Sequence, residues 1–133
     1  MKQVLALILI FSVSGCAIVN ALTMSKFDNN EYAMVNDIRS AAASAKNKCG
    51  AFDENTMVDN LHYQALVLKN YSQYIPDNAP TIKMTTELYD IVQGLNDKYH
   101  GNEPVSAAYC KLKLGNIEKN AETIQKSLGS KPR

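Results

Sequence analysis

Only a few side chains in this sequence could carry out covalent or metal-ligating chemistry. They are the cysteines Cys16, Cys49 and Cys110 and the histidines His62 and His100. Each histidine follows an aspartate by three positions, as Asp59-x-x-His62 and Asp97-x-x-His100. On a helix this spacing places a carboxylate and an imidazole on one face, where both could ligate a divalent metal. The sequence carries no glycine-rich phosphate loop and no serine nucleophile elbow.

The two Asp-x-x-His pairs resemble the Glu-x-x-His elements of di-metal helical bundles. Three features depart from that pattern. The acids are aspartates, the pairs lie beside the predicted apolar faces, and we expect no inward glutamate on the first and fourth helices. We therefore predict no catalytic residue, no metal and no other cofactor. The alternative is a metal-binding or enzymatic bundle that uses Asp59, His62, Asp97 and His100.

The amino-terminal residues are typical of an export signal. Lys2 gives a positively charged start, and Val4 to Val13 form an apolar run of 10 residues, which is too short to span a bilayer. The run ends in Val13-Ser14-Gly15-Cys16, which resembles the lipobox of bacterial lipoproteins. The resemblance implies removal of residues 1–15, a lipid on the thiol of Cys16 and a flexible linker over residues 16–29. Ala17, in the place of an aspartate, implies sorting to the outer membrane, with the body facing the periplasm.

A second cleavage site remains open. Val19-Asn20-Ala21 fits the small-x-small pattern of ordinary signal peptidase, which would release a soluble periplasmic protein beginning at Leu22. Either cut removes Lys2 from the 14 basic residues and leaves 13 against 13 acidic ones. A neutral body has no basic face for phosphates, so we expect no nucleic-acid partner.

Cys49 and Cys110 are the two cysteines that remain after either cut. Both routes lead to an oxidising compartment, where a leftover pair of cysteines favours a disulfide over a metal site or a thiol nucleophile. We predict that Cys49 and Cys110 are bonded to each other.

Hydrophobic periodicity predicts the elements that must position these residues. The chain of 133 residues is long enough for one domain, and 46% hydrophobic residues can supply its core. Apolar steps of three and four residues predict four helices over residues 30–129 and no strand. These helices are predicted to begin at Asn29 or Asn30, at Thr56, at the turn with Pro80 and at Asn102-Glu103-Pro104, and to end at Gly50, before Pro76, near Gly101 and at Gly129.

The short loops favour an all-α, antiparallel up-down-up-down four-helix bundle. In that topology the end of the first helix and the start of the fourth share a pole, which agrees with a Cys49–Cys110 disulfide. The predicted core faces are Tyr32, Val35, Ile38, Ala42, Ala45 and Cys49; Met57, Val58, Leu61, Ala65, Leu68 and Ile75; Met84, Leu88, Ile91, Val92, Leu95 and Tyr99; and Ala107, Cys110, Leu114, Ile117, Ala121, Ile124 and Leu128.

Two further apolar stripes lie away from these faces. They are Tyr63, Val67, Tyr71 and Tyr74 on the second helix, and Val105, Tyr109 and Leu112 on the fourth. One interpretation is that both helices have wide buried faces, or that Gly115 bends the fourth. The other is a docking patch, because tyrosine combines a large contact area with a polar group. We predict these seven residues as a partner-binding surface.

Residues 130–133 form a small basic tail, in which Lys131 and Arg133, with nearby Lys126, could face anionic lipid head groups. The sequence as a whole favours a lipid-anchored protein that contacts a partner in the cell envelope and catalyses no reaction. Through the lipobox alone it resembles small components of envelope assemblies and the exclusion lipoproteins of phages and plasmids. Those resemblances imply a scaffold, an adaptor or an exclusion-type inhibitor.

Overall fold

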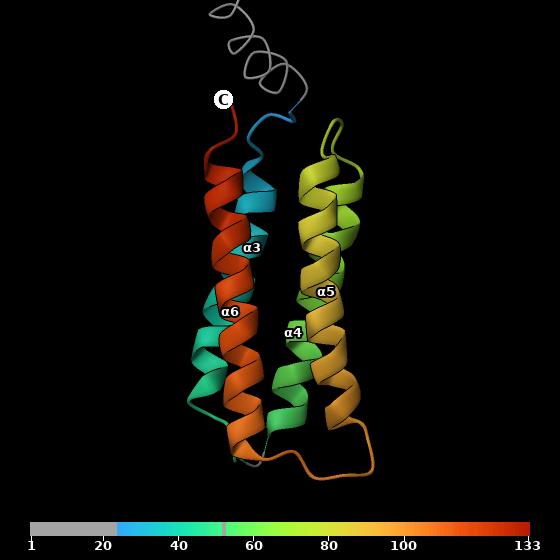
Figure 1. Cartoon of the computed structure of the whole chain (residues 1–133), viewed down its shortest axis with the longest axis vertical. Helices are drawn as coiled ribbons and strands as arrows, with labels where there is room; N and C mark the ends of the chain where they lie inside the picture. The colour runs from blue at the N-terminus through green and yellow to red at the C-terminus, as the bar shows by residue number, and fades with distance from the viewer. Residues whose placement is uncertain (1–23, 52) are drawn as a thin grey trace, which may run out of the picture.

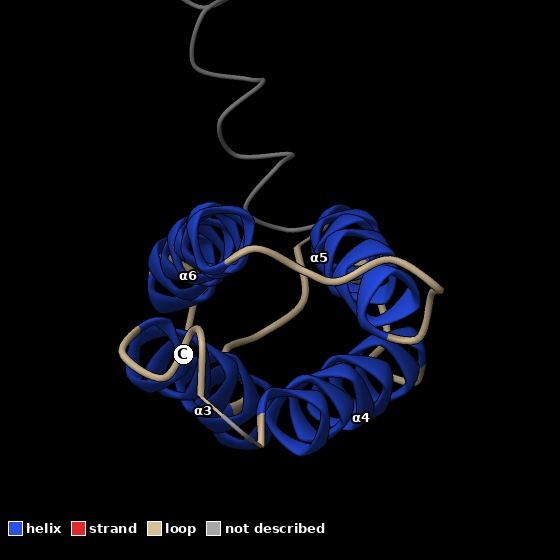
Figure 2. Cartoon of the chain, turned by 90° about the horizontal axis from the view of Figure 1, so that it is seen from below, coloured by secondary structure: helices blue, strands red, loops and turns tan. Residues whose placement is uncertain are grey.

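The structure is a computed structural model that describes residues 24–51 and 53–133. Within that range the elements are four helices and no strand: α3 (Asn29–Lys46), α4 (Glu54–Gln73), α5 (Ala79–Tyr99) and α6 (Ala107–Gly129). The helices run alternately up and down (Figure 1), and the end-on view places them at the four corners of a square (Figure 2). The predicted antiparallel four-helix bundle is confirmed.

The helix starts differ from the predicted ones at three places. Asp28 caps α3, because its Oδ1 accepts a 2.7 Å hydrogen bond from the backbone N–H of Glu31. The second helix begins at Glu54, two residues before Thr56. Ser106 caps α6, so Pro104 lies in the loop and not in the first turn. Only at α5 does the proline lie in the first turn, as predicted.

The core follows the predicted faces. Its buried residues are Val35, Ile38, Ala42, Ala45, Val58, Leu61, Ala65, Leu68, Leu88, Val92, Leu95, Tyr99, Cys110, Leu114, Ile117, Ala121, Ile124 and Leu128. Burying each large aliphatic side chain among them contributes roughly 1.5–3 kcal/mol. Seven predicted core positions differ, because helix ends and edges leave them at the rim: Tyr32, Cys49, Met57, Ile75, Met84 and Ile91 are half-buried, and Ala107 is exposed.

The two chain segments at the ends of the described range, residues 24–28 and 130–133, meet the α4–α5 loop at one end of the bundle (Figure 1), which we call the terminal pole. A polar network is buried there. Lys131 Nζ lies 3.1 Å from Glu31 Oε2 and donates to Asn78 Oδ1 at 2.6 Å. Asn78 Nδ2 donates to Glu31 Oε1 at 2.8 Å and to the carbonyl of Ser72, and Ser25 Oγ donates to Asn78 Oδ1.

This network corrects three expectations from the sequence. Glu31 is fully buried, so the first helix does carry an inward glutamate. Lys131 is only 6% exposed and belongs to the fold, because the carboxylate of Glu31 compensates its buried charge. Ser25 and Phe27 are also tied down, by backbone hydrogen bonds to the carbonyls of Asp77 and Pro132, so residues 25–29 are not part of a flexible linker.

The opposite end, which we call the disulfide pole, holds the Cys49–Cys110 bond, as predicted. The two Cα atoms are 5.8 Å apart, and the bond joins residues 61 positions apart in the sequence. The covalent link connects the end of α3 to the first turns of α6. These two helices also pack together more closely than α3 packs against α4.

The buried ion pair yields a stability prediction. Lys131→Met leaves the Glu31 carboxylate buried without its cation, which costs roughly 3–5 kcal/mol in comparable buried pairs. The double change Glu31→Gln with Lys131→Met removes both charges and should recover much of that loss. Urea unfolding followed by circular dichroism measures both, with exposed Lys119→Met as the matched control. A Lys131→Met protein as stable as the control would contradict the role given to the pair.

The disulfide yields a second prediction. Closing a loop of 61 residues contributes roughly 4 kcal/mol in the chain-entropy relation, so reduction should lower stability by about that amount. The helical circular dichroism should persist, because the apolar core is intact without the bond. The double variant Cys49→Ala and Cys110→Ala should match the reduced protein. Unchanged stability after reduction, or free thiols in protein alkylated during extraction from cells, would count against the bond.

Candidate functional site

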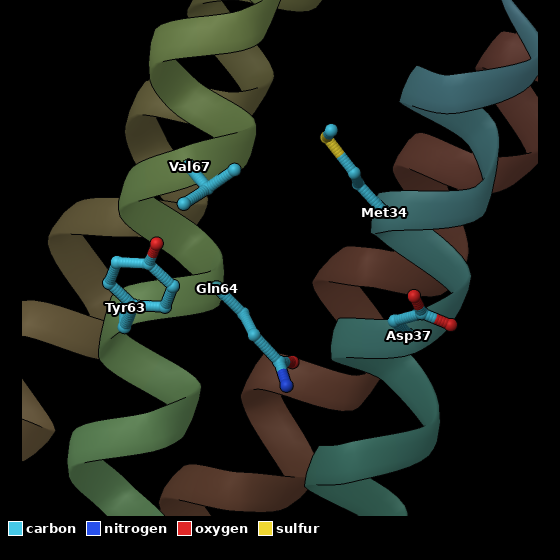
Figure 3. A pocket seen from close by; sticks show the side chains of 5 residues that line it. All are labelled: Met34, Asp37, Tyr63, Gln64 and Val67. Carbon is cyan, nitrogen blue, oxygen red and sulfur yellow. The ribbon is translucent and has the colours of Figure 1, made fainter.

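The described surface is hollowed along the seam between α3 and α4. A pocket of about 140 Å³ lies there at mid-height, lined by Met34, Asp37, Tyr63, Gln64 and Val67. Figure 3 shows the side chains of Met34 and Val67 reaching toward each other from the two helices, with Tyr63 beside Val67. Tyr63 is 65% exposed, one of the three most exposed large apolar side chains of the described chain. We call this hollow the α3–α4 groove.

Small side chains on α3 lie farther along this seam, toward the disulfide pole, and none of them lines the α3–α4 groove. Residues 40–45 read Ser-Ala-Ala-Ala-Ser-Ala, and the short side chains leave space where longer ones would reach α4. A second hollow of about 210 Å³ follows the same seam toward the disulfide pole, between Ala41 and Ser44 on α3 and Met57 and Asn60 on α4. The seam therefore carries two separate hollows, which share no lining residue.

Two polar groups give the groove its chemistry. Gln64 reaches toward α3 (Figure 3), and its Oε1 is buried without a hydrogen-bond partner among the described residues. An unpaired buried acceptor costs about 1–3 kcal/mol, which a donor entering the groove would offset. Asp37 adds an exposed carboxylate at the rim. Pockets for drug-sized ligands are roughly 300–1000 Å³, so the mid-height pocket suits a single side chain better.

The predicted tyrosine stripe of α4 divides into three environments. Tyr63 and Val67 line the groove. Tyr71 is half-buried, and its hydroxyl donates to Asp28 and accepts a 3.2 Å hydrogen bond from Asn30 Nδ2. Because Asp28 is the cap of α3, Tyr71 braces the start of that helix. Tyr74, at the terminal pole, is 88% exposed.

The predicted surface on α6 divides in a similar way. Val105 and Tyr109 pack against the edge of the core, and Lys113 lies over the ring of Tyr109, 5.5 Å from its centroid. Leu112 is 62% exposed. Leu112 is therefore the member of this set with the most surface free for a partner.

The two Asp-x-x-His pairs lie at the outer seam between α4 and α5, and the contacts cross between the pairs. His100 Nε2 lies 2.6 Å from Asp59 Oδ1, and both side chains are half-exposed. His62 Nε2 lies 2.6 Å from Gln93 Oε1, while Gln93 Nε2 donates to Asp97 Oδ1. Gln93 thus lies between His62 and Asp97. A metal shared by these two residues would have to contact both side chains directly. The inward Glu31 lies at the opposite pole and cannot complete this set.

The one group of three His, Cys, Asp or Glu ligand atoms within 4.8 Å of one another, in the described part of the chain, is Cys49, Glu54 and Cys110. Two of these atoms are the disulfide sulfurs, so the oxidised protein offers a metal only the Glu54 carboxylate. Tyr99 lies nearby in a wide hollow of about 510 Å³. Burial and the negative charge of Glu54 raise the pKa of Tyr99 to about 12.

Sequence reasoning did not identify Met34, Asp37 and Gln64 as part of the surface. Each lies one position away from a core residue on its helix, and no pattern in the chain marks which flanking residues meet across a seam. The alanine-rich run at 40–45 is no signal for them, because its residues Ala41, Ser44 and Ala45 line the second hollow and not the groove.

Cys16 and Ala21, the residues on which the two processing routes depend, lie outside the described residues. None of the helices in the described range is both long and apolar enough to cross a membrane.

Comparison with known proteins finds no match for this chain. No protein-family model matches the chain, and neither a curated protein nor a solved structure is significantly similar to it. The function must therefore be argued from the site itself.

Proposed function

We propose that this protein is a lipid-anchored, periplasm-facing helical bundle that acts by contact with another envelope protein and not by catalysis. The observation that carries the proposal is the α3–α4 groove, where the exposed ring of Tyr63 lies beside a hollow between Met34 and Val67. An exposed aromatic ring next to an apolar hollow is the usual make-up of an interaction hot spot.

The groove defines the chemistry of its partner. One apolar side chain can enter the pocket between Met34 and Val67, and a neighbouring hydrogen-bond donor can reach Gln64 Oε1. A basic residue of the partner can face the carboxylate of Asp37. A segment that presents an apolar side chain flanked by a donor and a positive charge fits all three features.

The anchor is the second half of the proposal, and it rests on the Val13-Ser14-Gly15-Cys16 lipobox. Two or three acyl chains hold a protein on a membrane stably, whereas one chain gives only marginal binding. A tethered bundle with a docking groove suits a scaffold, an adaptor or an exclusion-type inhibitor, because each of these acts by occupying a partner.

Matched alanine variants test the groove. Tyr63→Ala should leave the unfolding free energy within about 0.5 kcal/mol of the wild-type value, as exposed sites do. It should weaken partner capture by roughly 2 kcal/mol or more, about 30-fold. Lys119→Ala is the control, because Lys119 is also exposed but lies on α6 and outside the predicted partner-binding residues.

Capture is measured by photo-crosslinking from a reactive residue placed at the exposed position 70 of α4, in intact envelopes, with each variant in turn. The proposal requires one partner whose crosslink is lost in Tyr63→Ala and kept in Lys119→Ala. Equal loss in both variants, or strong destabilisation by Tyr63→Ala, would remove the groove as the docking surface.

The anchor has a test of its own. The mature protein from the membrane fraction should begin at Cys16 and exceed the mass of residues 16–133 by an acylated glyceryl group, because the thiol carries the lipid. Cys16→Ser should accumulate as unprocessed precursor. A mature chain beginning at Leu22 would show instead the soluble periplasmic protein cut after Ala21.

A further inference from the structure

The terminal pole carries an exposed aromatic residue that the groove does not use. Tyr74 caps the end of α4 and is 88% exposed, the highest value among the large hydrophobic side chains of the described chain. Ile75, which follows it, is half-buried, and Pro76 is exposed. Together Tyr74, Ile75 and Pro76 form an apolar tip on the α4–α5 loop.

The loop behind this tip is held firmly. Asp77 has a backbone φ of 55°, in the left-handed region, and completes the turn into α5. The next residue, Asn78, is buried in the network with Glu31 and Lys131. The ring of Tyr74 is thus presented on a fixed support, and docking it orders no additional backbone.

The chain that leads from Cys16 enters the fold against this same loop. The backbone N–H of Ser25 donates to the Asp77 carbonyl at 3.0 Å, and its Oγ donates to Asn78 at 2.8 Å. The nine residue steps from Cys16 to Ser25 span about 30 Å at full extension. The helix α6, with 23 residues, extends about 35 Å along the bundle. A lipid on Cys16 therefore keeps the terminal pole, and not the disulfide pole, near the bilayer.

We infer that the terminal pole docks on the lipid bilayer, with Tyr74 and Ile75 at the level of the head groups. This inference rests on the proposed lipid anchor. Tyrosine is enriched at membrane–water interfaces, where its ring meets apolar material and its hydroxyl stays hydrated. The exposed cations Lys26 and Arg133 and the exposed carboxylate of Asp77 lie at the same pole. With Lys131 buried, the aromatic tip and not a basic tail makes the principal contact.

This docking orients the bundle. Its axis stands away from the membrane, the disulfide pole is farthest from the bilayer, and the α3–α4 groove opens sideways at mid-height. A partner anchored in the same membrane could reach the groove without displacing the lipid contact.

The chain contains no tryptophan, so single tryptophans can report on each level of the bundle. Tyr74→Trp probes the terminal pole, Tyr63→Trp the middle of α4 and Leu112→Trp the region toward the disulfide pole. The full-length lipidated variants are reconstituted into phosphatidylcholine vesicles with or without brominated acyl chains. We expect brominated lipid to reduce the fluorescence of Tyr74→Trp alone, with a shift of its emission to shorter wavelength.

Flotation of the same vesicles reports separately on the anchor. Protein that floats while its Tyr74→Trp fluorescence is unquenched overturns the docking of this pole and leaves the anchor in place. Stronger quenching at position 63 or 112 also overturns it, because the bundle would then lie on its side. Protein that does not float overturns the anchor and this inference together. A blue shift of Tyr74→Trp that depends on protein concentration and not on lipid would assign the tip to a second copy of the chain.

Discussion

The buried ion pair between Lys131 and Glu31 is the constraint on which the rest of the terminal pole depends. Lys131 follows α6, Glu31 opens α3, and Asn78, which bonds to both, opens α5. Removing two charges from water is costly, so the attraction between the two residues adds little to the free energy of unfolding. The pair acts mainly by destabilising any arrangement that separates the two charges. Three segments far apart in the sequence are thereby held in one register. The position of the α4–α5 loop, and with it the tip at Tyr74, follows from that register.

At the disulfide pole a covalent bond holds the end of α3 to α6, as the ion pair holds the segments of the terminal pole. The contacts at the two poles together explain where the groove lies. Between them α3 and α6 are joined by the Lys46–Glu118 ion pair and by the contacts of Gln125 with Arg39 and Asn36. No comparable ion pair or side-chain hydrogen bond joins α3 to α4 along the middle of their seam in the described chain. The same set of contacts therefore explains both the close packing of α3 against α6 and the looser seam between α3 and α4. No further structural feature is needed to account for the hollow beside Tyr63.

The sequence predicted those features of the fold that depend on the spacing and the number of particular residue types. The apolar period identified Val35, Leu68, Leu88 and Leu114 as core, and cysteine parity identified the bond between Cys49 and Cys110. The burial of Glu31 and Lys131 could not be predicted, because each is an ordinary charged residue until the fold places it beside a partner 100 positions away. The same holds for Gln64, whose unpaired oxygen has meaning only across the seam to α3. Three of the five groove residues, Met34, Asp37 and Gln64, thus depend on tertiary contacts that no periodic pattern describes.

Tyr71 and Tyr74 show how sharply position decides the role of one residue type. They lie three residues apart on the same helix, yet Tyr71 bonds to the cap of α3 while Tyr74 extends beyond the last turn. A truncation at Tyr71 removes hydrogen bonds to Asp28 and Asn30, so its effect on a partner would be mixed with its effect on the start of α3. Tyr63 and Tyr74 have no such contact with the cap, and their rings are mostly in solvent. The number of tyrosines in the stripe therefore does not decide their role. Exposure and a rigid support distinguish Tyr63 and Tyr74, on which the proposed contacts rest, from Tyr71, which maintains the fold.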